Sequence, residues 1–325
     1  MSNIENNTLS QINLLAERMN GTIIGQELVV RRIIACLLAD GNMLLEGLPG
    51  LAKTRAINSL AKFMDLGLSR VQFTPDLLPS DVTGTEIYQP GGEEAFVFQK
   101  GPIFNNLILA DEINRAPAKV QAALLEAMQE RQVTVAGTTH QLPAPFFVMA
   151  TQNPIEQEGT YPLPEAQMDR FLLHVNVEYP SPEDELKVLR LVRSESAPRN
   201  KEKVEKIDPQ VIADARAQIN EVQVAENIEK YIVDIITATR QPEKYDEDLA
   251  RWIEVGASPR ATIGLENMGR VNAWMEGRDY VTVEDIRAVA HDVLRHRISL
   301  SYEANADRKS GNDIVDLLLR KVAVS

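Results

Sequence analysis

The sequence predicts an α/β fold with a parallel β-sheet and inserted β-hairpins, followed by a smaller all-helical domain. Short apolar runs alternate with helix-like segments over residues 1–180, which is typical of strands that are joined by helices. Two stretches with a central turn interrupt this alternation and predict the hairpins. After Tyr179 the strand-like runs stop, and the later segments have helical periodicity. We therefore expect a first domain over residues 1–180 and a second over residues 181–325.

The composition is that of a globular protein. Of the 325 residues, 44% are apolar and 25% are charged, so the chain can bury a full core. The net charge of −13 argues against nucleic acid as the main partner, because phosphate binding needs clustered Lys and Arg. The chain lacks a long apolar run and a signal-like N-terminus, so we expect no membrane span and a cytoplasmic location. Cys36 is the only cysteine, which excludes an internal disulfide, and it is expected to pack in the core.

A glycine-bearing loop joins the first predicted strand, Met43–Leu45, to a helix that begins near Lys53. Backbone N–H groups and the positive end of the helix converge at such a loop, which predicts a phosphate site. Lys53 would supply a charge for the outer phosphates, and Thr54 a hydroxyl for the Mg²⁺ that accompanies a nucleoside triphosphate. The pattern G-x-x-x-x-G-K-[ST] has a glycine where Ala52 stands, so Gly50 is expected to take the tighter bend. The alternative is a Gly-Pro turn before an amphipathic helix. The expected cradle consists of Gly47, Leu48, Pro49, Gly50, Leu51, Ala52, Lys53 and Thr54.

Two helices are expected before this loop, over Thr8–Arg18 and about Glu27–Ala39. Between them lies the apolar turn Gly21–Gln26, which contains Ile24 and Gly25. A turn in this place can fold over the adenine ring of a nucleotide, although packing between the two helices explains the same residues equally well.

The segment after the loop predicts a helix over Lys53–Met64 and a strand over Ser69–Thr74. A hairpin follows, with strands at Glu86–Gln89 and Ala95–Gln99. Its tip carries two glutamates and could touch a partner, but a solvated surface hairpin is an equally good explanation.

An apolar run that ends in two carboxylates, Asn106–Glu112, predicts a strand buried on both faces. Ligands of open α/β sheets bind beyond the carboxyl ends of the strands, so Asp111 and Glu112 are expected to meet the phosphates. Asp111 would hold Mg²⁺, and Glu112 would orient and polarise the attacking water. The alternative is a pair of acids that stabilise the start of the helix Pro117–Gln129.

A second hairpin is predicted over Gln132–Leu142, with Ala136–Thr139 as its turn, and another buried strand over Phe146–Thr151. Asn153 follows that strand and can reach the same water molecule as Glu112. The alternative role for Asn153 is that of a turn former before proline.

Two arginines are further candidates. Arg170 precedes the last core strand, Leu172–Val177, and is either part of a surface ion pair or a cation for the triphosphate of a neighbouring subunit. Arg260 lies in the first turn of a helix that Ser258 and Pro259 begin, and could point at phosphate, although a surface arginine is the usual case. The helices of the second domain are expected at Pro209–Ile219, Ala225–Thr239, Pro259–Trp274, Val283–Leu294 and Asp313–Val322.

Five stretches carry a resemblance to a known family. They are Gly47–Thr54, Phe73–Pro79, Asp111–Ala116, Ala150–Pro154 and Met168–Phe171. Together they resemble the MoxR family of AAA+ ATPases, and the resemblance covers most of the chain. It implies a P-loop NTPase core with a helical lid domain, which binds ATP with Mg²⁺ and hydrolyses it. The family tolerates alanine before the loop lysine.

The resemblance also implies a role for each candidate residue. Gly47–Thr54 would be the Walker A loop, Asp111 and Glu112 the Walker B pair, Asn153 sensor 1, Arg170 an arginine finger and Arg260 sensor 2.

The partners are likewise implied by the family. Its members look like chaperone-type motors that form rings, here expected to be a hexamer, and that act with von Willebrand factor A domain proteins. Two alternatives stay open: a nucleotide-gated binding scaffold with little turnover, and a DNA-remodelling motor, against which the acidic charge argues.

Overall fold

The computed structural model describes residues 3–47, 53–90, 95–153, 159–195 and 205–324. The chain divides into two compact units. The sheet unit consists of Ser10–Leu163 and Val175–Ile212, and the helical unit of Met1–Leu9, Pro164–His174 and Ala213–Ser325. Both units therefore draw on separate stretches of sequence. The expected division into domains at residue 180 stays a prediction.

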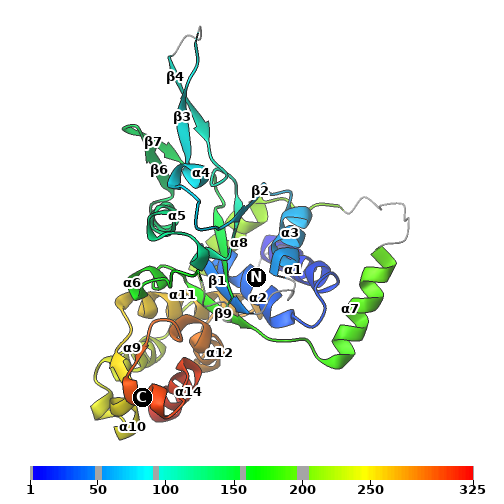
Figure 1. Cartoon of the computed structure of the whole chain (residues 1–325). Coiled ribbons are helices and arrows are strands. Elements are labelled where there is room, and N and C mark those ends of the chain that lie inside the picture. Colours follow the sequence, from blue (N-terminus) through cyan, green and yellow to red (C-terminus); the bar gives the residue numbers. More distant parts are fainter. Residues whose placement is uncertain (1–2, 48–52, 91–94, 154–158, 196–204, 325) are drawn as a thin grey trace. The chain divides into compact units, whose positions relative to one another are not determined.

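The sheet unit is built on a sheet that has five strands in the described part of the chain, in the order β2-β5-β8-β1-β9 (Figure 1). The β2–β5, β5–β8 and β1–β8 pairs are parallel. The central strands are buried along almost their whole length, because helices cover parallel sheets on both faces. The strands are β1 (Met43–Gly47), β2 (Leu68–Gln72), β5 (Leu107–Asp111), β8 (Phe147–Gln152) and β9 (Leu173–Val177).

Amphipathic helices accompany this sheet. In α2, the buried residues include Cys36, which is fully buried, as the sequence predicts. Helix α7 begins at an N-cap: the backbone N–H of Asp184 donates to the Ser181 hydroxyl over 3.2 Å. The helices are α1 (Asn3–Asn20), α2 (Glu27–Leu38), α3 (Lys53–Met64), α4 (Pro79–Thr83), α5 (Ala118–Glu130) and α7 (Pro182–Glu195), with a 3₁₀ turn, η1, at Ile113–Arg115.

Two antiparallel hairpins are inserted in the sheet unit, as the sequence predicts. They are formed by β3 (Gly84–Tyr88) with β4 (Phe96–Lys100), and by β6 (Gln132–Val135) with β7 (Thr138–Gln141). The rings of Phe98 and His140 stack with their centroids 4.0 Å apart, so the two hairpins pack on each other. Both lie at the same end of the unit (Figure 1).

The helical unit buries its core between α9, α11, α12 and α14, with Tyr231, Leu265 and Val289 fully buried. Its helices have strong N-terminal signals, such as the capping box that Thr282 and Asp285 form at the start of α12. The elements that lie wholly or mostly in this unit are α6 (Glu165–Met168), α8 (Gln210–Asn220), α9 (Glu226–Arg240), η2 (Pro242–Lys244), α10 (Glu247–Trp252), β10 (Ile253–Val255), α11 (Pro259–Met275), α12 (Val283–Leu294), β11 (Ser299–Leu300), α13 (Tyr302–Ala306) and α14 (Gly311–Lys321).

The structure differs from the sequence predictions in two details. Strands do not stop after Tyr179, because β10 and β11 pair in an antiparallel two-stranded sheet, so the second part of the chain is not all-helical. Strands of two or three residues are too short to show an alternating pattern. The turn of the second hairpin has two residues instead of four: Ala136 and Gly137, both at positive φ, connect β6 directly to β7.

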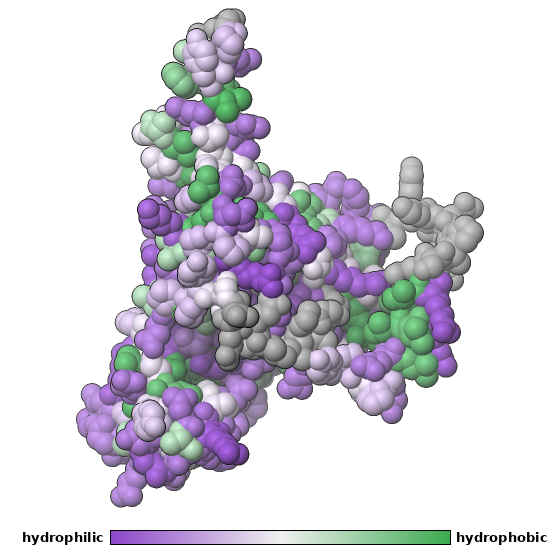
Figure 2. All heavy atoms as spheres, in the orientation of Figure 1, coloured by the Kyte–Doolittle hydropathy of each residue, from purple (hydrophilic) through white to green (hydrophobic). Residues whose placement is uncertain are grey.

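Part of the apolar surface of the sheet unit is exposed. On α7, Leu186, Leu189 and Val192 are 46–47% exposed and form the apolar area that covers this helix in Figure 2. On the first hairpin, Tyr88 and Phe96 are more than half exposed and their rings pair at 5.6 Å. None of the helices in the described ranges combines the length and the apolar character that a membrane span needs.

Candidate active site

The described parts of the predicted phosphate cradle are its two ends. Gly47 ends β1, and Lys53 and Thr54 begin α3, so the predicted strand before the cradle and the predicted helix after it are confirmed. The predicted loop residues Leu48, Pro49, Gly50, Leu51 and Ala52 lie outside the described residues.

The ammonium group of Lys53 lies against the ends of two neighbouring strands. Its Nζ donates to the carbonyl oxygen of Gly47 over 2.7 Å and to that of Gln152, the last residue of β8, over 3.4 Å. Burial is the main cause that lowers the pKa of Lys53, and the charges of Asp111, Glu112 and Glu46 oppose this shift. The lysine and the acids therefore share one electrostatic environment.

Asp111 ends β5 and has a partner at each carboxylate oxygen. The Thr151 hydroxyl donates to Oδ1 over 2.7 Å, and the Arg70 guanidinium donates to Oδ2 over 2.7 Å. Arg70 reaches it from β2, which pairs with β5 so that Gln72 stands opposite Asp111. These contacts fix the orientation of the carboxylate.

Glu112 has a left-handed backbone conformation, with φ 57° and ψ 51°. Its backbone N–H donates to the Thr151 hydroxyl over 2.9 Å, so Thr151 is bonded to both acids. The side chain accepts a hydrogen bond from Gln72 over 2.8 Å and forms an ion pair with Arg115 at 3.1 Å. A non-glycine residue with positive φ is uncommon, and such residues cluster at functional sites.

Four residues around the acids were not predicted from the sequence as part of the site. They are Arg70, Gln72, Arg115 and Thr151. The signal for Arg70 and Gln72 was present, since polar residues near the carboxyl end of a strand face the ligand edge of the sheet. The sequence does not show that β2 is the neighbour of β5, and without that strand order the two residues cannot be placed beside the acids.

Asn153 and the upstream turn also belong to the sheet unit. Asn153 directly follows β8 and is buried. The turn with Ile24 and Gly25 packs on the segment after β9: Gln26 donates to the Glu178 carbonyl oxygen over 2.8 Å. This contact tests neither nucleotide binding nor packing between the two helices, so nucleotide binding by Ile24 and Gly25 stays a prediction.

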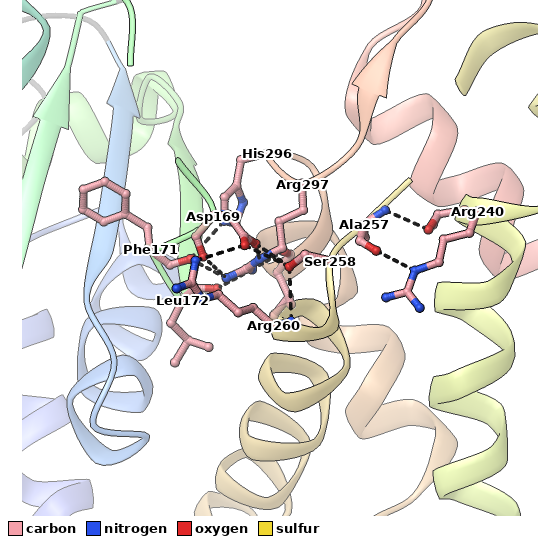
Figure 3. A network of polar contacts seen from close by, with 11 residues as sticks. Asp169, Phe171, Leu172, Arg240, Ala257, Ser258, Arg260, His296 and Arg297 are labelled. Carbon is pink, nitrogen blue, oxygen red and sulfur yellow. Dashed lines mark hydrogen bonds and ion pairs between the residues drawn. The ribbon is translucent and has the colours of Figure 1, made fainter. Parts of the chain in front are cut away.

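The helical unit contains the other two predicted site residues, Arg170 and Arg260 (Figure 3 shows Arg260). Arg260 is in the first turn of α11, as predicted, and the Ser258 hydroxyl accepts its backbone N–H. Its guanidinium forms an ion pair with Asp169 at 3.3 Å. The side chain of the neighbouring Arg170 makes no hydrogen bond or ion pair with the other described residues.

The residues of the sheet unit suit a nucleoside triphosphate with Mg²⁺. Lys53 offers a cation at the end of the cradle, and Thr54 and Asp111 offer the hard oxygen ligands that Mg²⁺ prefers. No cluster of three His, Cys, Asp or Glu residues in the described ranges could hold a metal ion by itself. A donor set with one carboxylate fits Mg²⁺, which is usually bound by one or two carboxylates together with phosphate oxygens.

Comparisons with known proteins identify the family. Residues 42–173 match the ATPase family associated with various cellular activities (AAA), and residues 248–318 match the AAA lid domain. The chain is 48% identical to Chaperone MoxR1 of Mycobacterium tuberculosis over 93% of its own length and 79% of that protein. The chain belongs to the MoxR family of AAA+ ATPases.

Two further relatives agree with this assignment. Protein MoxR of Methylorubrum extorquens is 32% identical over 86% of the chain and 84% of its own length. A crystal structure of a candidate ATPase from Cytophaga hutchinsonii superimposes with a TM-score of 0.91 at 47% identity, covering 99% of this chain and 97% of that one. The predicted fold class, a P-loop NTPase core of AAA+ type with a helical lid region, is thereby confirmed.

Membership of the MoxR family makes the chain an ATPase. Lys53, Asp111 and Glu112 lie in one environment in the sheet unit, and Arg260 lies beside Asp169 in the helical unit.

Proposed function

We propose that this MoxR-type ATPase hydrolyses ATP with Mg²⁺ at the carboxyl ends of β1, β5 and β8. Lys53 binds the outer phosphates, and Thr54 and Asp111 hold Mg²⁺, Asp111 through water, since Mg²⁺ usually keeps several of its water molecules. The metal ion neutralises the charge that develops on the phosphate oxygens. Glu112 orients and polarises the attacking water, Asn153 senses the γ-phosphate as sensor 1, and Arg260 acts as sensor 2.

One observation carries this proposal. Lys53, Asp111 and Glu112 come from different elements, α3 and the end of β5, and all three meet the end of β8. Lys53 Nζ lies 3.4 Å from the Gln152 carbonyl oxygen, and the neighbouring Thr151 hydroxyl binds Asp111 and the Glu112 N–H. Phosphoryl transfer needs a cation for the phosphates and a carboxylate for the water, held at fixed positions relative to each other.

The test separates ATP binding from turnover. Lys53→Ala is expected to lose both, whereas Glu112→Gln keeps its affinity for ATP and loses turnover by about 10²-fold or more, because only water activation is removed. Binding is measured by calorimetry and turnover by phosphate release. The matched controls are Lys62→Ala at the end of α3 and Glu126→Gln on the exposed face of α5. Wild-type turnover in Glu112→Gln would refute the role of Glu112.

We further propose that the chain works as a ring, with six subunits by analogy with its family, and remodels protein clients together with von Willebrand factor A domain proteins. The name of the Mycobacterium relative, Chaperone MoxR1, supports a chaperone-like role. In the ring, Arg170 acts on the γ-phosphate of the neighbouring subunit. An arginine supplied in trans is worth about 10³-fold or more in rate.

Mixing two inactive variants tests the action of Arg170 across an interface. Arg170→Ala subunits keep an intact phosphate site, and Lys53→Ala subunits keep an intact Arg170. If Arg170 acts in trans, the mixture regains activity at interfaces that join the two intact parts. A mixture that assembles normally but stays as inactive as its parents would refute the trans role.

A further inference from the structure

One buried arginine of the helical unit binds the chain on both sides of Arg170. The guanidinium of Arg297 donates to Asp169 Oδ1 over 2.9 Å and to the carbonyl oxygen of Phe171 over 2.6 Å (Figure 3). It also donates to the carbonyl oxygens of Asp169 over 3.3 Å and of Leu172 over 3.1 Å. The Arg297 side chain is only 3% exposed. Its planar fork of donors can bind several oxygens at fixed angles, which the point charge of a lysine cannot do.

Two more groups hold the same segment. The Ser258 hydroxyl lies 2.9 Å from Asp169 Oδ2, and the Arg260 guanidinium lies 3.3 Å from that oxygen. On the other side of Arg170, the ring of His296 donates from Nε2 to the Phe171 carbonyl oxygen over 3.0 Å. The backbone before and after Arg170 is therefore bound by side chains from α11 and from the segment after α12.

Arg170 itself is held only through its backbone. Its N–H donates to the Gln167 carbonyl oxygen over 3.2 Å, and its guanidinium has no hydrogen bond or ion pair among the described residues. The direction of its side chain thus depends on the backbone that Arg297 binds. Burial of a charged group is unfavourable unless well-placed hydrogen bonds offset the loss of water. Here four oxygens of one segment accept hydrogen bonds from the Arg297 guanidinium.

We infer that Arg297 is a positioning residue for Arg170: it fixes the segment Asp169–Leu172 so that Arg170 projects from the subunit towards the nucleotide of a neighbour. This inference rests on the proposed trans action of Arg170. Arg297 is more than a hundred positions away from Arg170 in sequence, and it acts on Arg170 only through the segment Asp169–Leu172.

The test uses Arg297→Lys, which keeps the charge and loses the multiple hydrogen bonds to the segment. Because a displacement of about 1 Å can cost about 10²-fold in rate, the kcat per subunit is expected to fall by that order, while the KM for ATP changes less than about twofold. The control is Arg270→Lys, since Arg270 also binds a carboxylate and a backbone carbonyl in the helical unit, those of Glu266 and Asn220. This control is expected to keep its kcat within about twofold.

Mixing distinguishes positioning from general damage. Arg297→Lys subunits have an intact phosphate site, so activity is expected to return with Lys53→Ala subunits, which supply a well-placed Arg170. With Arg170→Ala subunits no interface receives a well-placed arginine, so the mixture is expected to stay inactive. Arg297→Gln, which keeps a hydrogen-bond donor but loses the fork of the guanidinium, is expected to give the same pattern if Arg297→Lys does not fold.

Three other results of the mixing experiment would overturn the inference about Arg297. Recovery with Arg170→Ala subunits would show that Arg297→Lys still supplies a working arginine, and would overturn the inference. Failure with both partners, with normal circular dichroism and assembly, would show general damage and would also overturn it. If the reference mixture of Arg170→Ala and Lys53→Ala does not recover, the trans role itself fails, and the inference fails with it.

Discussion

Thr151 is the residue that joins the two acids of the site. It is fully buried in β8, where its hydroxyl donates to Asp111 Oδ1 and accepts the backbone N–H of Glu112. One side chain therefore fixes the orientation of the carboxylate proposed to hold the metal and the left-handed backbone of the residue proposed to activate water. Second-layer contacts of this kind orient the groups that bind the ligand.

Thr151→Val is expected to lower turnover about tenfold while ATP binding persists. Valine has nearly the same shape but cannot bond either acid, and an unsatisfied buried group costs about 1–3 kcal/mol. Phosphate release and calorimetric binding measure the two effects. Thr134→Val, which removes an exposed hydroxyl pair from the second hairpin, is the control. Unchanged turnover in Thr151→Val would show that the acids do not need this bridge.

His296 makes the stability of the helical unit depend on pH. Burial, together with the nearby Arg297 and His174, lowers the pKa of His296 well below its usual value of 6.5. Below pH 6.5 the unfolded chain binds a proton that the folded chain excludes, so the free energy of unfolding decreases as the pH falls. The slope is at most about 1.4 kcal/mol per pH unit for this one group.

His296→Gln is expected to flatten this dependence between pH 6.5 and 5, because the amide can donate to Phe171 without titrating. Urea unfolding at several pH values measures the slope, with His140→Gln on the surface hairpin as control. A slope equal to that of the wild type in His296→Gln would contradict the assignment.

At the scale of elements, apolar runs predicted the central strands and the position of Asp111 and Glu112 correctly. A buried parallel strand needs a continuous apolar run, and its carboxyl end is where polar residues meet the ligand. The contacts of Arg70 and Gln72 were out of reach because strand order is a tertiary property: β2 and β5 are separated by a whole hairpin in sequence. The contacts of Arg297 with the segment Asp169–Leu172 could not be predicted for the same reason, since they join residues 125 or more positions apart.

Two glycines in the hairpins have positive φ, but only one of them is crowded, so replacing each by alanine separates the cost of crowding from the cost of backbone strain. Gly84, at φ +94°, begins β3, and a Cβ there would collide with the Gln99 carbonyl oxygen and lie 2.6 Å from Gly101 N. Gly137, at φ +84° in the second hairpin, has open space around it. Gly137→Ala is therefore expected to cost only the strain of a left-handed alanine, about 1–2 kcal/mol.

Gly84→Ala is expected to cost several kcal/mol more than Gly137→Ala, because its collision is with backbone that cannot move aside. Urea unfolding of the two variants against wild type measures the difference. Equal costs would show that the first hairpin can shift relative to the segment around Gly101.

For the whole molecule, activity is expected to depend on assembly. A trans-acting Arg170 makes the isolated subunit nearly inactive, so the specific activity should rise with protein concentration over the range in which sedimentation shows ring formation. The net charge of −13 makes subunits repel one another, so moderate salt should shift this rise to lower concentration. Arg170→Ala is expected to assemble like wild type and to stay about 10³-fold less active at every concentration. Full activity in dilute monomer would contradict the ring requirement.

The single cysteine, which is buried, allows local unfolding of the sheet unit to be measured by thiol labelling. Cys36 is the only thiol in the chain and is fully enclosed in α2, so a labelling reagent can reach it only when this helix leaves the core. Where opening and closing are fast, the labelling rate divided by that of a free thiol gives the fraction of molecules that are open. A mass spectrometer then measures the fraction of chains that carry the added mass of one label. In a mixture of two variants, the mass of each variant shows which of them opened.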